Sequence, residues 1–83
     1  GPKEIKIANV LGLDETKAKL ELLKQGFLYD NIDVGEKYDE DHEPGVVLEQ
    51  EPKYGTQVSA DSAVKIYINS YKGNADSSDT AAE

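Results

Sequence analysis

The side chains best able to do chemistry in this sequence are carboxylates, which gather in two places. The first is DEDHE, residues 39–43, where the single histidine, His42, stands among four acidic residues. Carboxylate oxygens and one imidazole could bind a hard cation or zinc. The run lacks the ligand spacing and the central glycine of an EF-hand loop, and charge runs of this kind are usually solvated. We therefore expect a solvated loop with no metal ion, and no cofactor.

The second place holds Glu49 and Glu51, whose spacing could suggest a general acid and base. Both would lie on one short strand beside a small core, which leaves no room for a substrate cleft. The chain has no cysteine, so thiol nucleophiles, thiolate metal sites and disulfides are excluded. The sequence therefore predicts a domain that is not an enzyme and has no catalytic residues.

Tyrosines offer a different chemistry, because the five in this chain exceed what a small core needs. An exposed tyrosine beside amide and ammonium groups could stack on the face of a sugar, although scattered surface aromatics are also common. The candidate ligand-binding residues are Glu49, Gln50, Lys53, Tyr54 and Tyr67.

The charge of the chain limits its partners. The net charge is −8, and the nine cationic side chains are all lysines, so no arginine is present to bind phosphate or guanine in bidentate fashion. The acidic field repels nucleic acids and anionic lipid head groups but attracts ligands with free amines. No apolar run approaches the ~18 residues of a membrane span. We expect no nucleic-acid partner, no direct membrane contact and a monomer in isolation.

Composition separates the ends of the chain from its middle. Gly1-Pro2 resembles the scar of a tag-cleaving protease and is set aside. The sequence KGNADSSDTAAE, from Lys72 onward, has no large apolar side chain that could offset the entropy of ordering. The sequence predicts one folded domain over residues 3–71 and a disordered tail over residues 72–83.

The clearest element is a helix from about Glu15 to Gln25. Asp14 can cap its first free amides, and a glycine follows Gln25, where a left-handed residue is favoured. Ala18 and Leu22 lie one turn apart and are predicted to face the core. Leu20 lies off this stripe, which leaves it either at the rim of the core or on a partner surface.

After the helix the apolar pattern changes to alternation, which indicates strands. Ile32 and Val34 share one face of the first strand, and VVLEQ forms the second, in which either Val46 and Leu48 or Val47 and Glu49 face the core. In the third strand Val64, Ile66 and Ile68 are predicted to point inward and Lys65, Tyr67 and Asn69 outward. KIAN, residues 6–9, is a further short extended segment. The expected fold is α+β, with one helix packed on a three-stranded antiparallel sheet.

Two segments, ANVLGLDETKAKLELLKQGF and PGVVLEQEPKYGTQVSADSAVKIYINS, together resemble the PASTA domain over residues 5–70. This module occurs in penicillin-binding proteins and in transmembrane serine/threonine kinases of Gram-positive bacteria. The matching positions are Gly12-Leu13, Ala18, Leu22, Gly26, Pro44-Gly45, Val47, Gln50, Pro52, Gly55, Val58 and Val64. Ala8 and Asp61 depart from the usual proline and glycine, and aspartate tolerates a left-handed turn position at small cost.

The resemblance implies a location on the outer side of a bacterial cell membrane, in the cell wall zone, in a membrane-anchored parent. It implies peptidoglycan or muropeptide fragments as ligands, with beta-lactams as a further candidate. It allows equally a structural spacer or protein-interaction repeat without a wall ligand. The polar tail indicates the C-terminal repeat of a kinase or of a penicillin-binding protein with transpeptidase activity.

Overall fold

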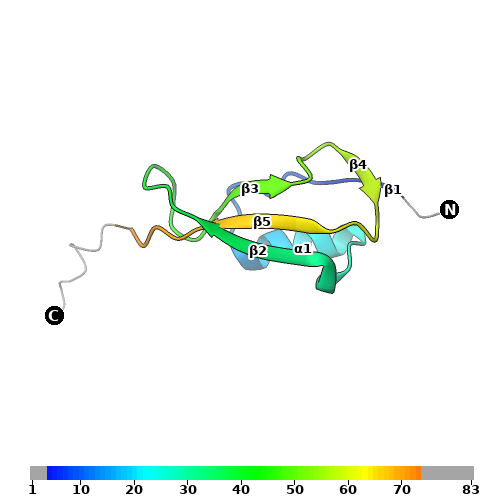
Figure 1. Cartoon of the computed structure of the whole chain (residues 1–83), viewed down its shortest axis with the longest axis horizontal. Coiled ribbons are helices and arrows are strands. Elements are labelled where there is room, and N and C mark those ends of the chain that lie inside the picture. Colours follow the sequence, from blue (N-terminus) through cyan, green and yellow to red (C-terminus); the bar gives the residue numbers. More distant parts are fainter. Residues whose placement is uncertain (1–3, 74–83) are drawn as a thin grey trace.

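The structure is a computed structural model and describes residues 4–73. Its elements are β1 (Glu4–Lys6), α1 (Glu15–Gln25), the 3-10 helix η1 (Tyr29–Asn31), β2 (Ile32–Lys37), β3 (Val47–Glu51), β4 (Gln57–Ser59) and β5 (Val64–Asn69). Helix α1 lies behind the strands in Figure 1, against one face of the sheet. No helix in this part of the chain is long and apolar enough to cross a membrane. The predicted tail lies, beyond its first two residues, outside the described range.

Helix α1 begins and ends where its capping residues predict. The Asp14 carboxylate accepts a hydrogen bond from the Lys17 backbone N–H at 2.8 Å. At the other end Gly26 has a φ of 112°, and its N–H donates to carbonyls of the last turn. Residues with a Cβ rarely adopt this conformation, so glycine is the residue that ends the helix here.

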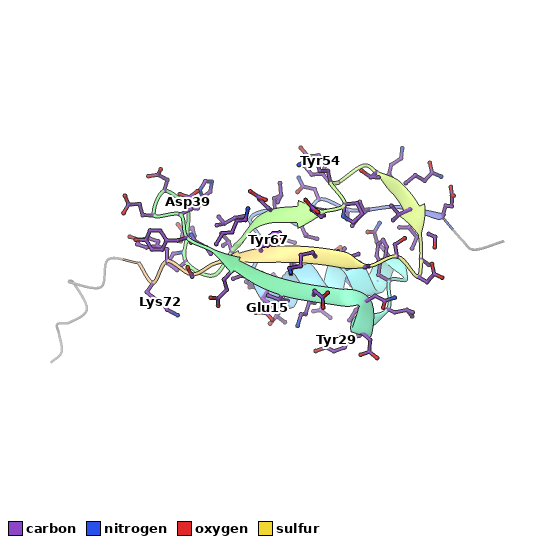
Figure 2. The ribbon with its side chains drawn as sticks, in the orientation of Figure 1. Glu15, Tyr29, Asp39, Tyr54, Tyr67 and Lys72 are labelled. Carbon is purple, nitrogen blue, oxygen red and sulfur yellow. The ribbon has the colours of Figure 1, made fainter. Side chains whose placement is uncertain are left out.

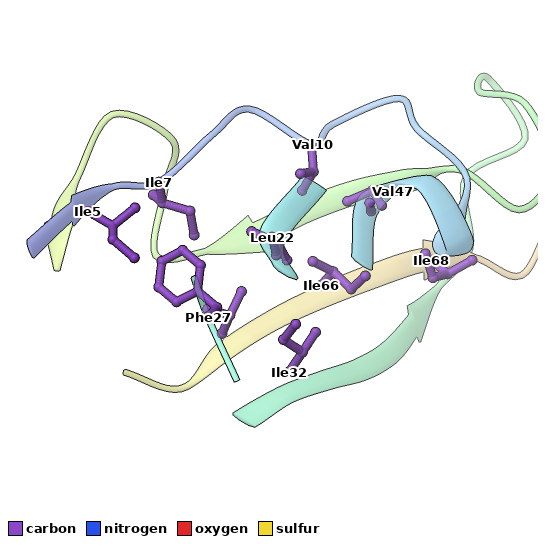
Figure 3. Packing of buried hydrophobic residues seen from close by; sticks show 11 residues of the cluster. Ile5, Ile7, Val10, Leu22, Phe27, Ile32, Val47, Ile66 and Ile68 are labelled. Atoms are coloured by element: carbon purple, nitrogen blue, oxygen red, sulfur yellow. The ribbon is translucent and has the colours of Figure 1, made fainter. Parts of the chain in front are cut away.

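The core lies between α1 and the sheet (Figure 3). Ala18 and Leu22 are fully buried, which confirms the predicted inner face of the helix, and Leu20 is half exposed. The inward side chains of the last strand are also as predicted. The buried apolar residues are Ile5, Ile7, Val10, Ala18, Leu22, Phe27, Ile32, Val47, Val64, Ile66 and Ile68.

The three-stranded sheet has the order β2-β5-β3, so β5 is central. The prediction of an α+β fold with one helix on three strands is confirmed. β3 pairs with β5 in antiparallel fashion, as expected, but β2 pairs with β5 in parallel. The chain reverses direction twice between β2 and β5, so these two strands run the same way. Alternation has the same period in both kinds of pair and could not distinguish them.

A second, two-stranded sheet pairs β1 with β4, with Ile5 opposite Val58. Part of the extended segment KIAN belongs to β1, which ends at Lys6. The three-residue strand β4 was not predicted, because so short a segment carries little pattern. This small sheet closes the end of the core at which Ile5 is buried.

Strand β3 follows neither of the two alternations considered. Val47 and Gln50 are the buried residues, at 2% and 4% exposure, whereas Glu49 is exposed. The register with β5 shifts between Val47 and Glu49, which is an irregularity of the β-bulge kind and moves the inward side chain by one position. The strand ends at Glu51, before Pro52, which has no N–H to donate to the ladder.

Two side chains differ from the strand pattern. Val34 was expected on the core face, but it lies on the edge strand β2 and is 37% exposed. Asn69 was expected to point to solvent, but it is only 3% exposed. Its side-chain amide points into the loop before β3 and forms hydrogen bonds with backbone groups of that loop.

Candidate functional site

Four of the five predicted ligand-binding residues lie around one shallow hollow. The hollow has a volume of about 390 Å³ and is lined by Leu11, Leu48, Glu49, Gln50, Lys53 and Tyr54. These residues come from β3, from the turn after it and from the segment before α1. Tyr67, the fifth, lies on β5 opposite Glu49, outside the lining of the hollow, and Figure 2 shows it on the three-stranded sheet.

Gln50 supports the hollow from below. Its Oε1 accepts a hydrogen bond from the Val10 N–H at 2.9 Å. Its Nε2 donates to the Ala8 carbonyl at 3.0 Å and to the Pro52 carbonyl at 3.3 Å. The amide therefore joins β3 to the segment before α1 and to the turn. Since backbone groups occupy the amide, Gln50 positions the lining of the hollow and does not offer its amide to a ligand.

Tyr67 lies beneath an ion pair that crosses the sheet. Lys37 Nζ, from β2, is 3.0 Å from Glu49 Oε1 on β3 and 4.8 Å from the centre of the Tyr67 ring. Lys65 Nζ is 5.4 Å from the same ring. A Cβ on Gly35 would lie only 3.0 Å from the Tyr67 ring, so the absence of a side chain there lets the ring lie against β2. The ring is thus partly covered by lysines.

The sequence did not predict Lys37 as part of the site. With β2 paired in parallel to β5, Lys37 lies opposite Asn69, next to Tyr67 on the outer face. The order of the strands was needed to see this. Both partners of the Lys37–Glu49 pair are about half exposed, so the pair contributes little stability and can exchange with ligand charges.

Tyr54 is the open aromatic surface of the site, since 54% of it is exposed. Glu49 and Lys53 place a carboxylate and an ammonium group in the same lining, and Leu11 and Leu48 add apolar surface. The arrangement can hold a small amphiphilic ligand that has an apolar face and charges of both signs. It has no nucleophile paired with a base.

The acidic loop at residues 39–43 is fixed by Asn69. Asn69 Nδ2 donates to the carbonyls of Asp39, His42 and Glu43 at 2.8, 3.1 and 2.9 Å. Asn69 Oδ1 accepts from the N–H groups of Asp39 and Tyr71, each at 3.0 Å. Within residues 4–73 no group of three or more histidine, cysteine or acidic side chains is placed to hold a metal ion. The lack of a bound metal stays a prediction.

The Asp39 carboxylate is expected to give the loop a measurable acid transition. The Asp41 N–H donates to Asp39 Oδ1 at 2.9 Å, and His42 Nδ1 lies 2.8 Å from Oδ2. Chiefly the first of these contacts, and then His42, lowers the pKa of Asp39 below its usual value of 3.8. Because the pKa is lower in the folded state, the ionised carboxylate stabilises the fold at pH values above the pKa of the unfolded chain. This contribution is lost as the pH falls through the pKa of the folded state.

The measurement is an NMR titration of the Asp41 amide from neutral pH down to about pH 2. The part of the shift that Asp39→Asn removes should have its midpoint below 3.8. A midpoint above that value would contradict the assignment.

Comparison with known proteins identifies the family of this fold. The family model for the PASTA domain matches residues 5–70. The chain belongs to the PASTA-domain family. A search of curated proteins finds no match.

Two solved structures contain domains similar to this PASTA domain. One is the entire extracellular region of the Ser/Thr kinase PrkC from Staphylococcus aureus, with 25% identity, a TM-score of 0.74 and 84% of this chain covered. The other is the three-PASTA-domain of a Ser/Thr kinase from the same organism, with 26% identity, a TM-score of 0.75 and 83% covered. The chain spans only 24% and 34% of these two solved chains, so it corresponds to one part of each.

Proposed function

We propose that this PASTA domain is an extracytoplasmic, non-catalytic module of a bacterial membrane serine/threonine kinase or penicillin-binding protein, and that it binds peptidoglycan fragments weakly at the hollow beside β3. The observation that carries the proposal is the exposed Tyr54 ring beside Glu49 and Lys53 in one hollow. The similar structure of the extracellular region of the kinase PrkC supports the location.

Each part of a muropeptide has a matching group in the hollow. The face of a sugar ring can stack on Tyr54, since the flat aromatic surface packs against its C–H groups. A free amine of the stem peptide is attracted to Glu49, and the net charge of −8 strengthens this attraction. A carboxylate of the peptide can pair with Lys53. The Lys37–Glu49 pair would open when the ligand's amine takes the place of Lys37.

The affinity of one domain is expected to be low, with Kd around ~0.1–1 mM or weaker. The hollow is shallow, and ion pairs exposed to water contribute little. A parent protein with several such domains would gain avidity on a polymeric wall.

The alternative function, a spacer or protein-interaction repeat, also has an observation in its favour. Strand β1 and Lys72 lie at opposite ends of the long axis of the domain (Figures 1 and 2). A module whose chain enters at one end and leaves at the other extends a tandem array by its full length. Such a geometry would suit a spacer as well as a ligand-binding module, so binding has to be measured directly.

We expect titration of labelled domain with purified muropeptides to shift the amides of Glu49, Lys53, Tyr54 and Tyr67 in a saturable way. Tyr54→Ala should weaken binding about tenfold, because ring stacking is worth on the order of 1 kcal/mol or more. Tyr29→Ala is the matched control, since Tyr29 is 60% exposed but lies outside the hollow.

Acetylation of the fragment's free amine should also weaken binding, and Glu49→Gln should remove most of this difference. The same titration with a beta-lactam tests the second candidate ligand. If several millimolar muropeptide causes no shift, the binding proposal is refuted and the spacer function stands.

A further inference from the structure

Strand β2 forms an open edge of the three-stranded sheet. The order β2-β5-β3 leaves β2 with one strand neighbour. The opposite edge, at β3, is partly covered, because the Gly12 N–H donates to the Val47 carbonyl and the Val47 N–H donates to the Leu13 carbonyl. Within residues 4–73 no backbone hydrogen bond from a loop or turn reaches the outer edge of β2 between residues 33 and 36. Such an edge can pair with another strand.

The backbone groups that point outward from β2 can be identified. The Ser70 N–H donates to the Lys37 carbonyl at 2.7 Å, so the carbonyl of Lys37 faces β5. Backbone groups alternate in direction along a strand, so those of Gly35 also face β5, while those of Val34 and Glu36 face away from it. Val34 and Glu36 therefore present two N–H donors and two carbonyl acceptors at the open edge.

We propose that the partner for this edge is a second copy of the same chain, paired β2 to β2 in antiparallel fashion about a two-fold axis at Gly35. In this register Val34 lies opposite Glu36 of the second copy, and Glu36 lies opposite its Val34. Both residues point their backbone groups at the partner, so each pair exchanges two hydrogen bonds. The result is one continuous sheet of six strands.

The charges of β2 select this register. With Gly35 on the axis, Asp33 lies opposite Lys37 of the second copy, whose Nζ also contacts Glu49 of its own chain at 3.0 Å, and the reciprocal pair forms by symmetry. Opposite charges directly across two antiparallel strands are stabilising, and like charges are destabilising. Moving the axis to Glu36 would place two Glu36 carboxylates against each other. Moving the axis to Val34 would place Asp33 against a glycine and lose both charge pairs.

Side-chain exposure supports the same contact. Val34 is 37% exposed on the helix side of β2, and the methylene groups of the facing Glu36 would cover it. Gly35 has no side chain at the axis, where the Tyr67 ring of its own chain already lies close. No side chain of β2 itself therefore lies at the axis, and the Tyr67 ring covers one face of Gly35 there.

The contact is expected to be weak in dilute solution. One strand edge buries less than the ~1,200 Å² typical of a stable complex, and a net charge of −8 on each copy opposes association. We expect a dimer Kd of about 1 mM, so the domain is a monomer at micromolar concentration. Pairing would matter where chains are held side by side and their effective concentration is high.

A dilution series followed by NMR, from about 0.05 to about 3 mM, tests this edge. The amides of Val34 and Glu36 should shift with concentration and become protected from exchange. Val34→Pro should abolish the shift without breaking the native sheet, because the outward N–H of Val34 makes no bond to β5. Val34→Ala is the control and should retain the concentration dependence.

Mixing two charge variants tests the register independently of the proline. Asp33→Lys alone and Lys37→Asp alone place like charges opposite each other, so each should dimerise about tenfold more weakly than the natural chain. A mixture of the two restores both opposite-charge pairs, so labelled D33K should respond to unlabelled K37D but not to itself. The proposal is overturned if the mixture shows no gain, or if concentration-dependent shifts lie away from β2.

Discussion

Replacing Leu22 with alanine is expected to lower the free energy of unfolding by about 2–5 kcal/mol. Leu22 is fully buried in the single core, where α1 covers the sheet. Its removal costs both the transfer free energy of the side chain and the cavity left behind. Native proteins have only about 5–15 kcal/mol of stability, so this loss is a large share of the total.

The matched control is Leu20→Ala, on the same helix and with the same chemistry. Leu20 is 50% exposed, so its truncation should change the stability by no more than about 0.5 kcal/mol. Urea unfolding of both variants measures the difference. Equal losses for the two variants would mean that the helix packs through another face.

The helix and its packing could be predicted because local chemistry determines them. The cap at Asp14 and the glycine after Gln25 act within one turn, and both lie where the structure has them. The inward face of β5 was also predicted, since its alternation is complete over six residues. Signals of this kind need no knowledge of the rest of the fold.

The errors share a different cause, which is contact between residues far apart in the sequence. The parallel pairing of β2 depends on the order of the strands, and the bulge in β3 depends on its register with β5. Asn69 looks like an outward strand residue until the loop that its amide holds is in place. The position of Gln50 in the floor of the hollow likewise depends on the bulge.

The candidate site contains residues that local sequence predicted and residues that only long-range contacts bring together. Glu49, Lys53 and Tyr54 were predicted together because they are neighbours in the chain. Lys37 was not, because it reaches Glu49 across the intervening strand β5. Leu11 was not, because it comes from the segment before α1. A binding surface built from three separate segments is visible in sequence only where one segment supplies several residues.

Gln50→Leu is expected to destabilise the domain by about 2–4 kcal/mol, although leucine is apolar and similar in size. The Val10 N–H is buried and would lose its acceptor, and the Ala8 carbonyl would lose its donor. A buried polar group without a partner costs on the order of 1–3 kcal/mol. Chemical denaturation of the variant measures the loss, and a change below about 0.5 kcal/mol would show that water or a shift of the backbone replaces the amide.

Gln50→Glu tests the acceptor and the donor of this amide separately. The variant keeps an acceptor for the Val10 N–H, but at neutral pH a carboxylate oxygen would face the Ala8 carbonyl that Gln50 Nε2 now binds. Burial and this repulsion raise the pKa of the introduced carboxyl group in the folded state above its unfolded value of about 4.3. Its destabilisation relative to the natural chain should therefore grow as pH rises above that value and be smallest below it, where the protonated carboxyl group can donate to Ala8. If the stability difference between the two chains does not change with pH, then the donor half of Gln50 contributes nothing, and the Val10 hydrogen bond alone holds the segment before α1 against β3.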